Sequence, residues 1–275
     1  MGRTNVPVGR IAVLVALVIG LWALGQRARA PGWRTLGPGV EFAMLRGDPF
    51  CRRGSSGVAL LRVDPRRTRL SVHHCSLEPG GAPLPILEWQ RRTGALAVFN
   101  AGQYYPDFSY MGLLVCGGRV VSRRVHPRFR AALVAAPECG APEAHVIDLD
   151  RAPLDPRHPG WREVAQSFML FDRGGAPRVR QSGRVANRTV VAEDRRGRLI
   201  VCTSEGGYTL WDFARLLQRA PLDLTHAMAM DGGFEAELCV KAGRFRYASF
   251  GRWHEGEKED APAVGLPAVI AVAAP

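Results

Sequence analysis

The 275-residue sequence lacks several motifs by which common protein classes are recognised. It has no CxxC pair and no cysteine–histidine spacing of the zinc-finger kind, so we expect no structural zinc site. A glycine-rich phosphate loop and a Gly-x-Ser-x-Gly motif are also absent, which argues against P-loop enzymes and α/β-hydrolases. The seven histidines show no ligand spacing, and the adjacent His73 and His74 would point to opposite faces of a strand. We therefore expect no transition metal, while calcium held by aspartate and backbone oxygens stays open.

Lysine is nearly absent, so almost all of the positive charge comes from arginine. Lys and Arg together number 37 against 25 Asp and Glu, which gives a formal net charge of +12. The arginines are scattered along the chain, whereas a nucleic-acid-binding domain gathers its basic residues on one face or stripe. We therefore expect no nucleic-acid partner. The positive field instead favours anionic partners such as phosphates, anionic lipids or acidic glycans.

The N-terminus has the pattern of an export signal. Two arginines precede an uncharged apolar stretch of 15 residues, Ile11 to Gly25, which is shorter than the roughly 20 residues of a full membrane span. Ala28 and Ala30 resemble a cleavage site, but Pro31 is expected to block the cut. Residues 1–30 are therefore predicted to be either a signal peptide or an uncleaved signal anchor. We expect a protein that is exported, and is either periplasmic or anchored in the membrane by this segment.

The number of cysteines is even, as in many exported proteins: Cys51, Cys75, Cys116, Cys139, Cys202 and Cys239. Disulfides are typical of oxidising compartments, and six cysteines allow 15 pairings. We expect at least one disulfide, although several of these residues can also be buried thiols.

Short apolar runs between glycine- and proline-rich turns predict many strands. Helices are predicted at Pro85 to Thr93, where Gly94 follows, and from Thr209, an N-cap residue; Trp161 to Gln166 is also helix-like. We therefore expect an α+β fold, a strand-rich single domain with two or three helices packed on a mixed or antiparallel sheet. The domain is predicted at residues 31–253, with a loosely ordered tail at residues 254–275. The sequence does not indicate an oligomeric state.

Asp231-Gly232-Gly233 is the most informative short motif. It ends the apolar run Ala227 to Met230 and precedes a second strand-like run from Leu238. An acid followed by two glycines lets the backbone turn sharply and leaves a carboxylate at a sheet edge, where a ligand can approach. A hairpin turn, in which the aspartate caps its own backbone, is the alternative.

Four motifs follow one another along the chain: Phe99-Asn100-Ala101-Gly102-Gln103-Tyr104-Tyr105 with Gly117-Gly118-Arg119, Gln166 to Leu170, Ser182 to Val191 with Asn187-Arg188-Thr189, and Thr209 to Leu217 leading to Asp231-Gly232-Gly233. This order resembles the phosphodiester glycosidases, the exported and lysosomal proteins related to N-acetylglucosamine-1-phosphodiester alpha-N-acetylglucosaminidase. The chain is most similar to their bacterial periplasmic branch.

Three places depart from the family pattern. Phe168 follows Gln166-Ser167 where the family usually has Gly-Pro, and Val191 stands where a glycine is frequent. After Asp-Gly-Gly the family favours small hydroxyl residues, whereas this chain has Phe234 and then two glutamates. The resemblance therefore implies the fold more firmly than the activity.

The resemblance implies cleavage of a glycosidic bond between a sugar and a phosphodiester. Such a site needs cationic donors for the phosphate and a carboxylate near the anomeric carbon. Asp231 is our candidate catalytic carboxylate, with Glu205 as its partner. Arg188 is the candidate phosphate clamp because its planar fork suits phosphate, and Arg184 is the second candidate. Each arginine can also be a plain surface charge.

The predicted substrate-binding set also contains Asn100, Gly102, Gly232 and Gly233. Asn100 ends an apolar strand and can bond a sugar hydroxyl, or form an Asx turn before Gly102. Glu235 and Glu237 are spaced to fall on one face of a strand, and they are also well explained as the solvated side of that strand.

Two functions follow. The first is an exported hydrolase that cleaves sugar-phosphodiester linkages in envelope or exogenous glycans. The second is a catalytically degenerate glycan-binding envelope protein of the same fold.

Overall fold

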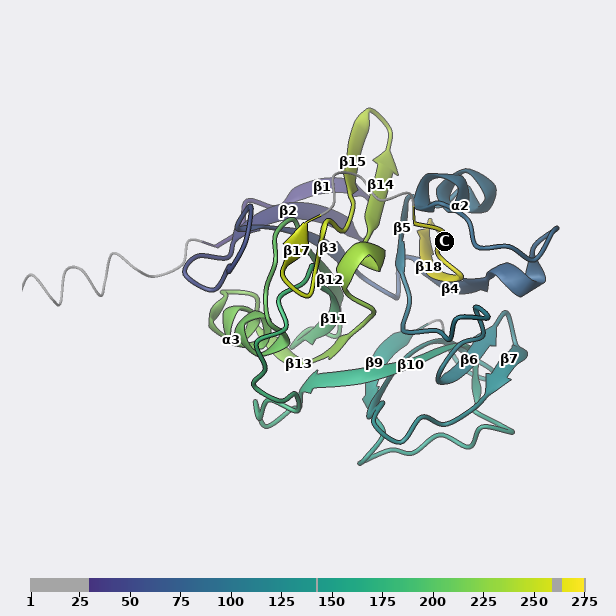
Figure 1. Cartoon of the computed structure of the whole chain (residues 1–275). Coiled ribbons are helices and arrows are strands. Elements are labelled where there is room, and N and C mark those ends of the chain that lie inside the picture. Colours follow the sequence, from purple (N-terminus) through teal and green to yellow (C-terminus); the bar gives the residue numbers. More distant parts are fainter. Residues whose placement is uncertain (1–29, 142, 259–263, 275) are drawn as a thin grey trace, which may run out of the picture.

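The computed structural model describes residues 30–141, 143–258 and 264–274, which form two packed antiparallel sheets (Figure 1). The predicted signal segment lies outside the described residues, apart from Ala30. Within the described residues, no helix is long and apolar enough to cross a membrane.

The large sheet has eleven strands. Nine follow the order β1-β2-β3-β12-β11-β13-β10-β6-β7, while β8 pairs with β10 and β9 pairs with β8. Their bounds are β1 Arg34–Gly37, β2 Val40–Arg46, β3 Gly57–Val63, β6 Leu113–Cys116, β7 Arg119–Arg123, β8 Ala131–Pro137, β9 Ala144–Asp148, β10 Trp161–Phe171, β11 Thr189–Asp194, β12 Leu199–Ser204 and β13 Leu224–Ala229. Figure 1 shows the long strand β10 running from the β6–β9 group toward β13.

The small sheet has the order β15-β14-β5-β18-β4. Its strands are β4 Arg69–His74, β5 Ala97–Asn100, β14 Leu238–Ala242, β15 Phe245–Ser249 and β18 Ala268–Ala273. A separate hairpin joins β16 (Trp253–His254) to β17 (Glu257–Lys258).

The described residues contain two α-helices, α2 (Ile86–Thr93) and α3 (Leu210–Arg219), and two short 3-10 helices, η1 (Cys75–Leu77) and η2 (Gly233–Glu235). The predicted end of α2 at Gly94 and the predicted start of α3 at Thr209 are confirmed. Gly94 ends α2 in the left-handed region, at φ 64°, and the Thr209 hydroxyl accepts a hydrogen bond from the Asp212 N–H.

The expected α+β class is wrong, because the fold is largely β. The helix-like segment Trp161 to Gln166 is the first half of β10 and pairs along its length with β8. This segment is buried mostly on both sides, so its apolar residues do not alternate as in a half-exposed strand. Backbone pairing with β8 therefore makes this segment a strand, although its residue pattern is helix-like.

The two sheets and the two helices pack in four layers, and this packing explains why several strands are apolar along their whole length. The two sheets share a core to which alternate residues such as Leu61, Val191 and Phe99 contribute. Helix α3 covers the other face of the large sheet, and α2 covers the other face of the small sheet. Central strands are consequently buried on both faces.

Two further expectations are corrected. The tail after Trp253 is not loosely ordered throughout, because Ala268–Ala273 forms β18 in the interior of the small sheet. The structure contains no disulfide, since all six cysteines are free, and Cys75, Cys116, Cys202 and Cys239 are buried thiols.

Candidate active site

The candidate site lies where the end of β13 meets the start of β11 and the end of β5. Strands β11 and β13 are antiparallel neighbours in the large sheet. Asp231, which follows β13, and Arg188, which precedes β11, therefore lie at the same end of that sheet. The Asp231 N–H donates to the Ala101 carbonyl (3.1 Å), and the Asn100 amide Nδ2 donates to the Asp231 carbonyl (3.0 Å). The turn that follows β13 is thereby fixed to the small sheet.

Burial raises the pKa of Asp231 to about 7, and the neighbouring Glu235 carboxylate adds to this effect. The Gly232 N–H donates to Asp231 Oδ1 (2.9 Å), and this bond, with the Gln103 side chain and the Arg188 charge, lowers the pKa but does not outweigh burial. The residue as a whole is half-buried, and its carboxyl group is the buried part. A carboxyl with a pKa near neutrality can accept or release a proton under ordinary conditions.

The guanidinium of Arg188 is held by backbone carbonyls. Nε donates to Tyr208 (2.8 Å) and Nη2 to Arg184 (2.7 Å), while Nη1 makes no hydrogen bond within the described residues. Burial lowers the pKa of Arg188 to about 10, and the Asp231 charge opposes that shift. The side chain therefore stays charged at neutral pH, and Nη1 is its nitrogen without a hydrogen bond within the described residues.

Gly232 lies against this guanidinium. A Cβ atom at Gly232 would lie 3.1 Å from Arg188 Nη1 and 2.8 Å from the Asn187 carbonyl, so the close approach requires glycine. Gly233 has φ +81°, donates its N–H to the Asn187 carbonyl (3.0 Å), and packs against His254. The two glycines thus shape the turn beside Asp231.

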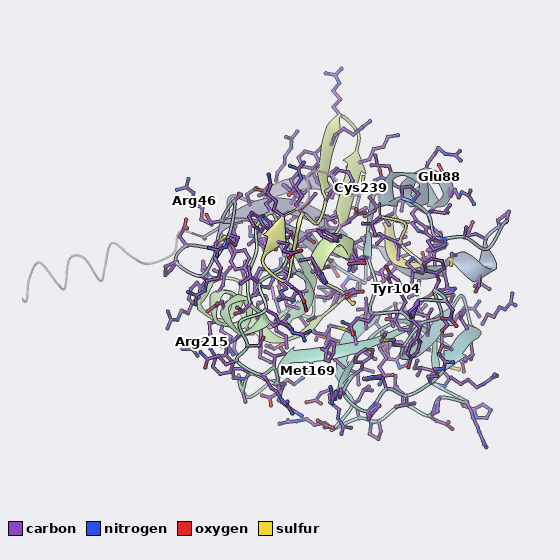
Figure 2. All side chains as sticks on the ribbon, viewed as in Figure 1. Arg46, Glu88, Tyr104, Met169, Arg215 and Cys239 are labelled. Carbon is purple, nitrogen blue, oxygen red and sulfur yellow. The ribbon has the colours of Figure 1, made fainter. Side chains whose placement is uncertain are left out.

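A second carboxylate belongs to Glu235, in η2. The Tyr104 hydroxyl donates to Glu235 Oε1 (3.1 Å), and Figure 2 labels Tyr104. Burial raises the pKa of Tyr104, and the charges of Glu235 and Asp231 raise it further. We call Gln103, Tyr104, Arg188, Asp231 and Glu235 the Asp231 cluster.

Asp231 and Arg188 lie close together, and the neighbouring carboxylate whose charge raises the pKa of Asp231 is that of Glu235. The carboxylate of the predicted partner, Glu205, accepts hydrogen bonds from Ser55 Oγ (2.8 Å) and Tyr247 Oη (3.2 Å). The predicted second arginine, Arg184, is exposed and pairs with Glu255 (3.1 Å).

Asn100 and Gly102 are buried and bonded to the protein itself. Asn100 Nδ2 also donates to the Ala101 carbonyl, and Asn100 Oδ1 accepts the Glu237 N–H (3.2 Å). The Gly102 N–H donates to the Tyr110 hydroxyl (3.0 Å), which leaves no room for a side chain there. Asn100 positions the Asp231 turn, and the side-chain amide of Asn100 and the N–H of Gly102 are both bonded to protein partners.

Sequence reasoning left three residues of this region without a role. Gln103 and Asn187 lie inside the quoted motifs, next to assigned residues; Asn187 is fully buried, and its Oδ1 accepts the N–H groups of Arg252 and Trp253. Glu237 was interpreted as solvated, but it is 2% exposed. Burial raises the pKa of Glu237 to about 8, with the Glu235 charge adding to the effect, and its Oε2 has no hydrogen-bond partner within the described residues. The alternation of strand residues did not apply to Glu237, because Glu235 lies in η2 and Glu237 precedes β14.

A model of the phosphodiester glycosidase family matches residues 93–266. The chain belongs to the phosphodiester glycosidase family. The matched region contains the whole Asp231 cluster. Membership supports a glycosidase-type function, and the family acts on phosphodiester-linked sugars.

Solved structures share the fold of this chain. The catalytic domain of zebrafish N-acetylglucosamine-1-phosphodiester alpha-N-acetylglucosaminidase, described as auto-inhibited by its pro-peptide, aligns with a TM-score of 0.62 and 16% identity. The alignment covers 90% of this chain and 87% of that chain. A hypothetical protein from Synechocystis aligns with a TM-score of 0.57 and 14% identity over 89% of this chain and 64% of that one. A comparison with curated protein sequences gives no match.

Proposed function

We propose that this protein is an exported hydrolase that cleaves the glycosidic bond of a sugar 1-phosphodiester in envelope or exogenous glycans. Family membership supports the reaction class. The observation that carries the proposal for this chain is the pairing of Asp231, whose pKa lies at about 7, with the charged Arg188 beside Gly232. Export rests on the N-terminal sequence pattern.

The reaction breaks the bond between the anomeric carbon and the phosphate oxygen. The bonding electrons leave with the phosphate monoester, and Arg188 Nη1 stabilises the negative charge that develops there. Water adds to the anomeric carbon, and Asp231, as a carboxylate, accepts the proton of that water. A phosphate leaving group needs little protonation, so a single carboxylate beside the anomeric carbon suffices for the chemical step.

Glu235 and Tyr104 position the base in this proposal. The Glu235 charge keeps the pKa of Asp231 high, and the Tyr104 hydroxyl fixes the Glu235 carboxylate by its hydrogen bond. Glu205 has no part in the chemical step, because its carboxylate is bound to Ser55 and Tyr247.

The test is the nearly isosteric variant Asp231→Asn. We expect kcat on sugar 1-phosphodiesters to fall at least about 100-fold, in line with the loss of a general base. Glu205→Gln is the matched control and should keep most of the activity. Release of phosphate monoester is measured over a panel of sugars, with and without calcium.

Undiminished release by Asp231→Asn would remove Asp231 from the mechanism. If the wild-type protein releases no product from any member of the panel but binds phosphorylated glycans, the degenerate glycan-binding function replaces the hydrolase.

A further inference from the structure

A polar hollow lies beside the Asp231 cluster and is not used by the proposed reaction. It encloses about 340 Å³ and is lined by the loop that precedes β11, by the start of α3 and by the loop after β2. The residues that matter for its chemistry are Arg52, Arg53, Gln181, Ser182 and Trp211.

The side chain of Arg188 connects the Asp231 cluster to the backbone beside the hollow. Its Nη2 bonds to the carbonyl of Arg184, and its Nε bonds to the carbonyl of Tyr208. The neighbours of these two residues, Val185 and Thr209, line the hollow. Arg188 therefore contacts both the Asp231 cluster and the backbone that borders the hollow.

The hollow keeps a positive charge. Its carboxylate, Asp212, is already paired, because Arg52 donates to both of its oxygens (2.8 and 2.9 Å) and Thr209 Oγ1 donates to Oδ2 (2.7 Å). Burial raises the pKa of Asp212, but the hydrogen bonds from Arg52 and Thr209 outweigh burial and lower it. The exposed guanidinium of Arg53 has no carboxylate partner within the described residues; its one hydrogen bond runs to the Arg52 carbonyl (3.4 Å). Arg53 is thus available to an anion.

The remaining lining suits a sugar ring. Trp211 is partly exposed and has no aromatic or cationic partner within the described part of the chain. Its flat face offers the kind of surface against which the C–H face of a pyranose packs. Gln181 and Ser182 are exposed, and their side chains can donate to and accept from sugar hydroxyls.

We propose that this hollow binds a second sugar-phosphate unit, so that the substrate is a glycan chain whose sugars are joined through phosphodiesters. Trp211 takes the sugar ring, Gln181 and Ser182 take its hydroxyls, and Arg53 takes the second phosphate. The inference rests on the proposed function, because the first unit occupies the Asp231 cluster.

The experiment compares two substrates: a hexose 1-phosphate methyl diester and a trimer of hexoses joined by phosphodiesters. For Trp211→Ala, and separately for Arg53→Ala, the ratio of kcat/KM on the trimer to kcat/KM on the methyl diester should fall about tenfold. Arg128→Ala, an exposed arginine without an ion pair within the described residues, is the control and should leave the ratio unchanged. An unchanged ratio in both hollow variants would overturn the inference.

Binding separates this inference from the proposed function. Calorimetry with the trimer is done in Asp231→Asn, with and without Trp211→Ala, and the second change should weaken binding about tenfold. If the wild-type protein cleaves neither substrate but this difference remains, the hydrolase proposal fails and the hollow stands. If the methyl diester is cleaved and the difference is absent, the hollow fails alone. A trinucleotide that binds as tightly as the trimer would overturn the glycan assignment.

Discussion

At the scale of single residues, the pKa of Asp231 sets the expected pH dependence of activity. With a pKa of about 7, the carboxylate that accepts the proton is lost as the pH falls through neutrality. We expect kcat/KM to drop about tenfold for each pH unit below 7. A pH–rate profile on a sugar 1-phosphodiester checks this, with Glu205→Gln giving the same profile. Constant kcat/KM down to pH 5 would contradict the role of Asp231 as base.

Glu237 provides a test of stability that is separate from catalysis. Its pKa in the folded protein is about 8, well above the ordinary 4.5 of glutamate, so the folded state binds the proton more tightly than the unfolded state. Folding stability is therefore lost as the pH rises from about 4.5 to 8. The unfolding free energy of Glu237→Gln should equal that of the wild-type protein at pH 4. At pH 8 it should be higher than that of the wild-type protein by roughly a few kcal/mol, which thermal melting would show as a higher melting temperature. Equal melting temperatures at pH 8 would show that Glu237 gains a partner when ionised.

The Asp-Gly-Gly motif indicated from the sequence a place of close approach, which was interpreted as the approach of a ligand. In the structure it is the guanidinium of Arg188 that lies against Gly232, so this glycine permits the contact. The partner carboxylate could not be read from the sequence, since Glu205 and Glu235 both lie near strand ends. Only the fold decides which of them faces Asp231.

At the scale of elements, the cap of α3 is both a folding signal and part of the hollow. The Thr209 hydroxyl accepts the Asp212 N–H (3.0 Å) and donates to Asp212 Oδ2. Thr209→Ala should lower the unfolding free energy by about 1 kcal/mol, and Thr209→Ser should restore most of it. Urea unfolding measures both variants. A loss that serine does not restore would assign the effect to the packing of the threonine methyl group.

Helices were predicted well where end signals exist, as at Gly94 and Thr209. Strands that are buried on both faces were harder to predict. Their apolar residues do not alternate with polar ones, and this alternation is what distinguishes a strand from a helix in a sequence. The segment at Trp161 illustrates this: its identity as strand comes from pairing with β8, about 30 residues earlier in the chain.

At the scale of the whole molecule, β18 joins the C-terminus to the interior. It pairs with β5 on one side and β4 on the other, and five of its residues are buried. A chain that ends at Pro267 should therefore lose cooperative folding, as circular dichroism during heating would show. A chain shortened by Pro275 alone is the control. A truncated chain that melts like the full one would mean that β18 contributes little to the sheet.

The tail was predicted to be loosely ordered because of its alanine, proline and charge content. Composition cannot show that a segment pairs with strands far away in the sequence. The strand that completes the small sheet, β18, lies outside the boundary predicted at residue 253.

The place of β18 also has a consequence for the order of events during synthesis. Strand β4 emerges from the ribosome early, whereas its neighbour β18 is the last strand to be made within the described residues. The small sheet therefore cannot close over the inter-sheet core until β18 has been synthesised, so this part of the core forms late.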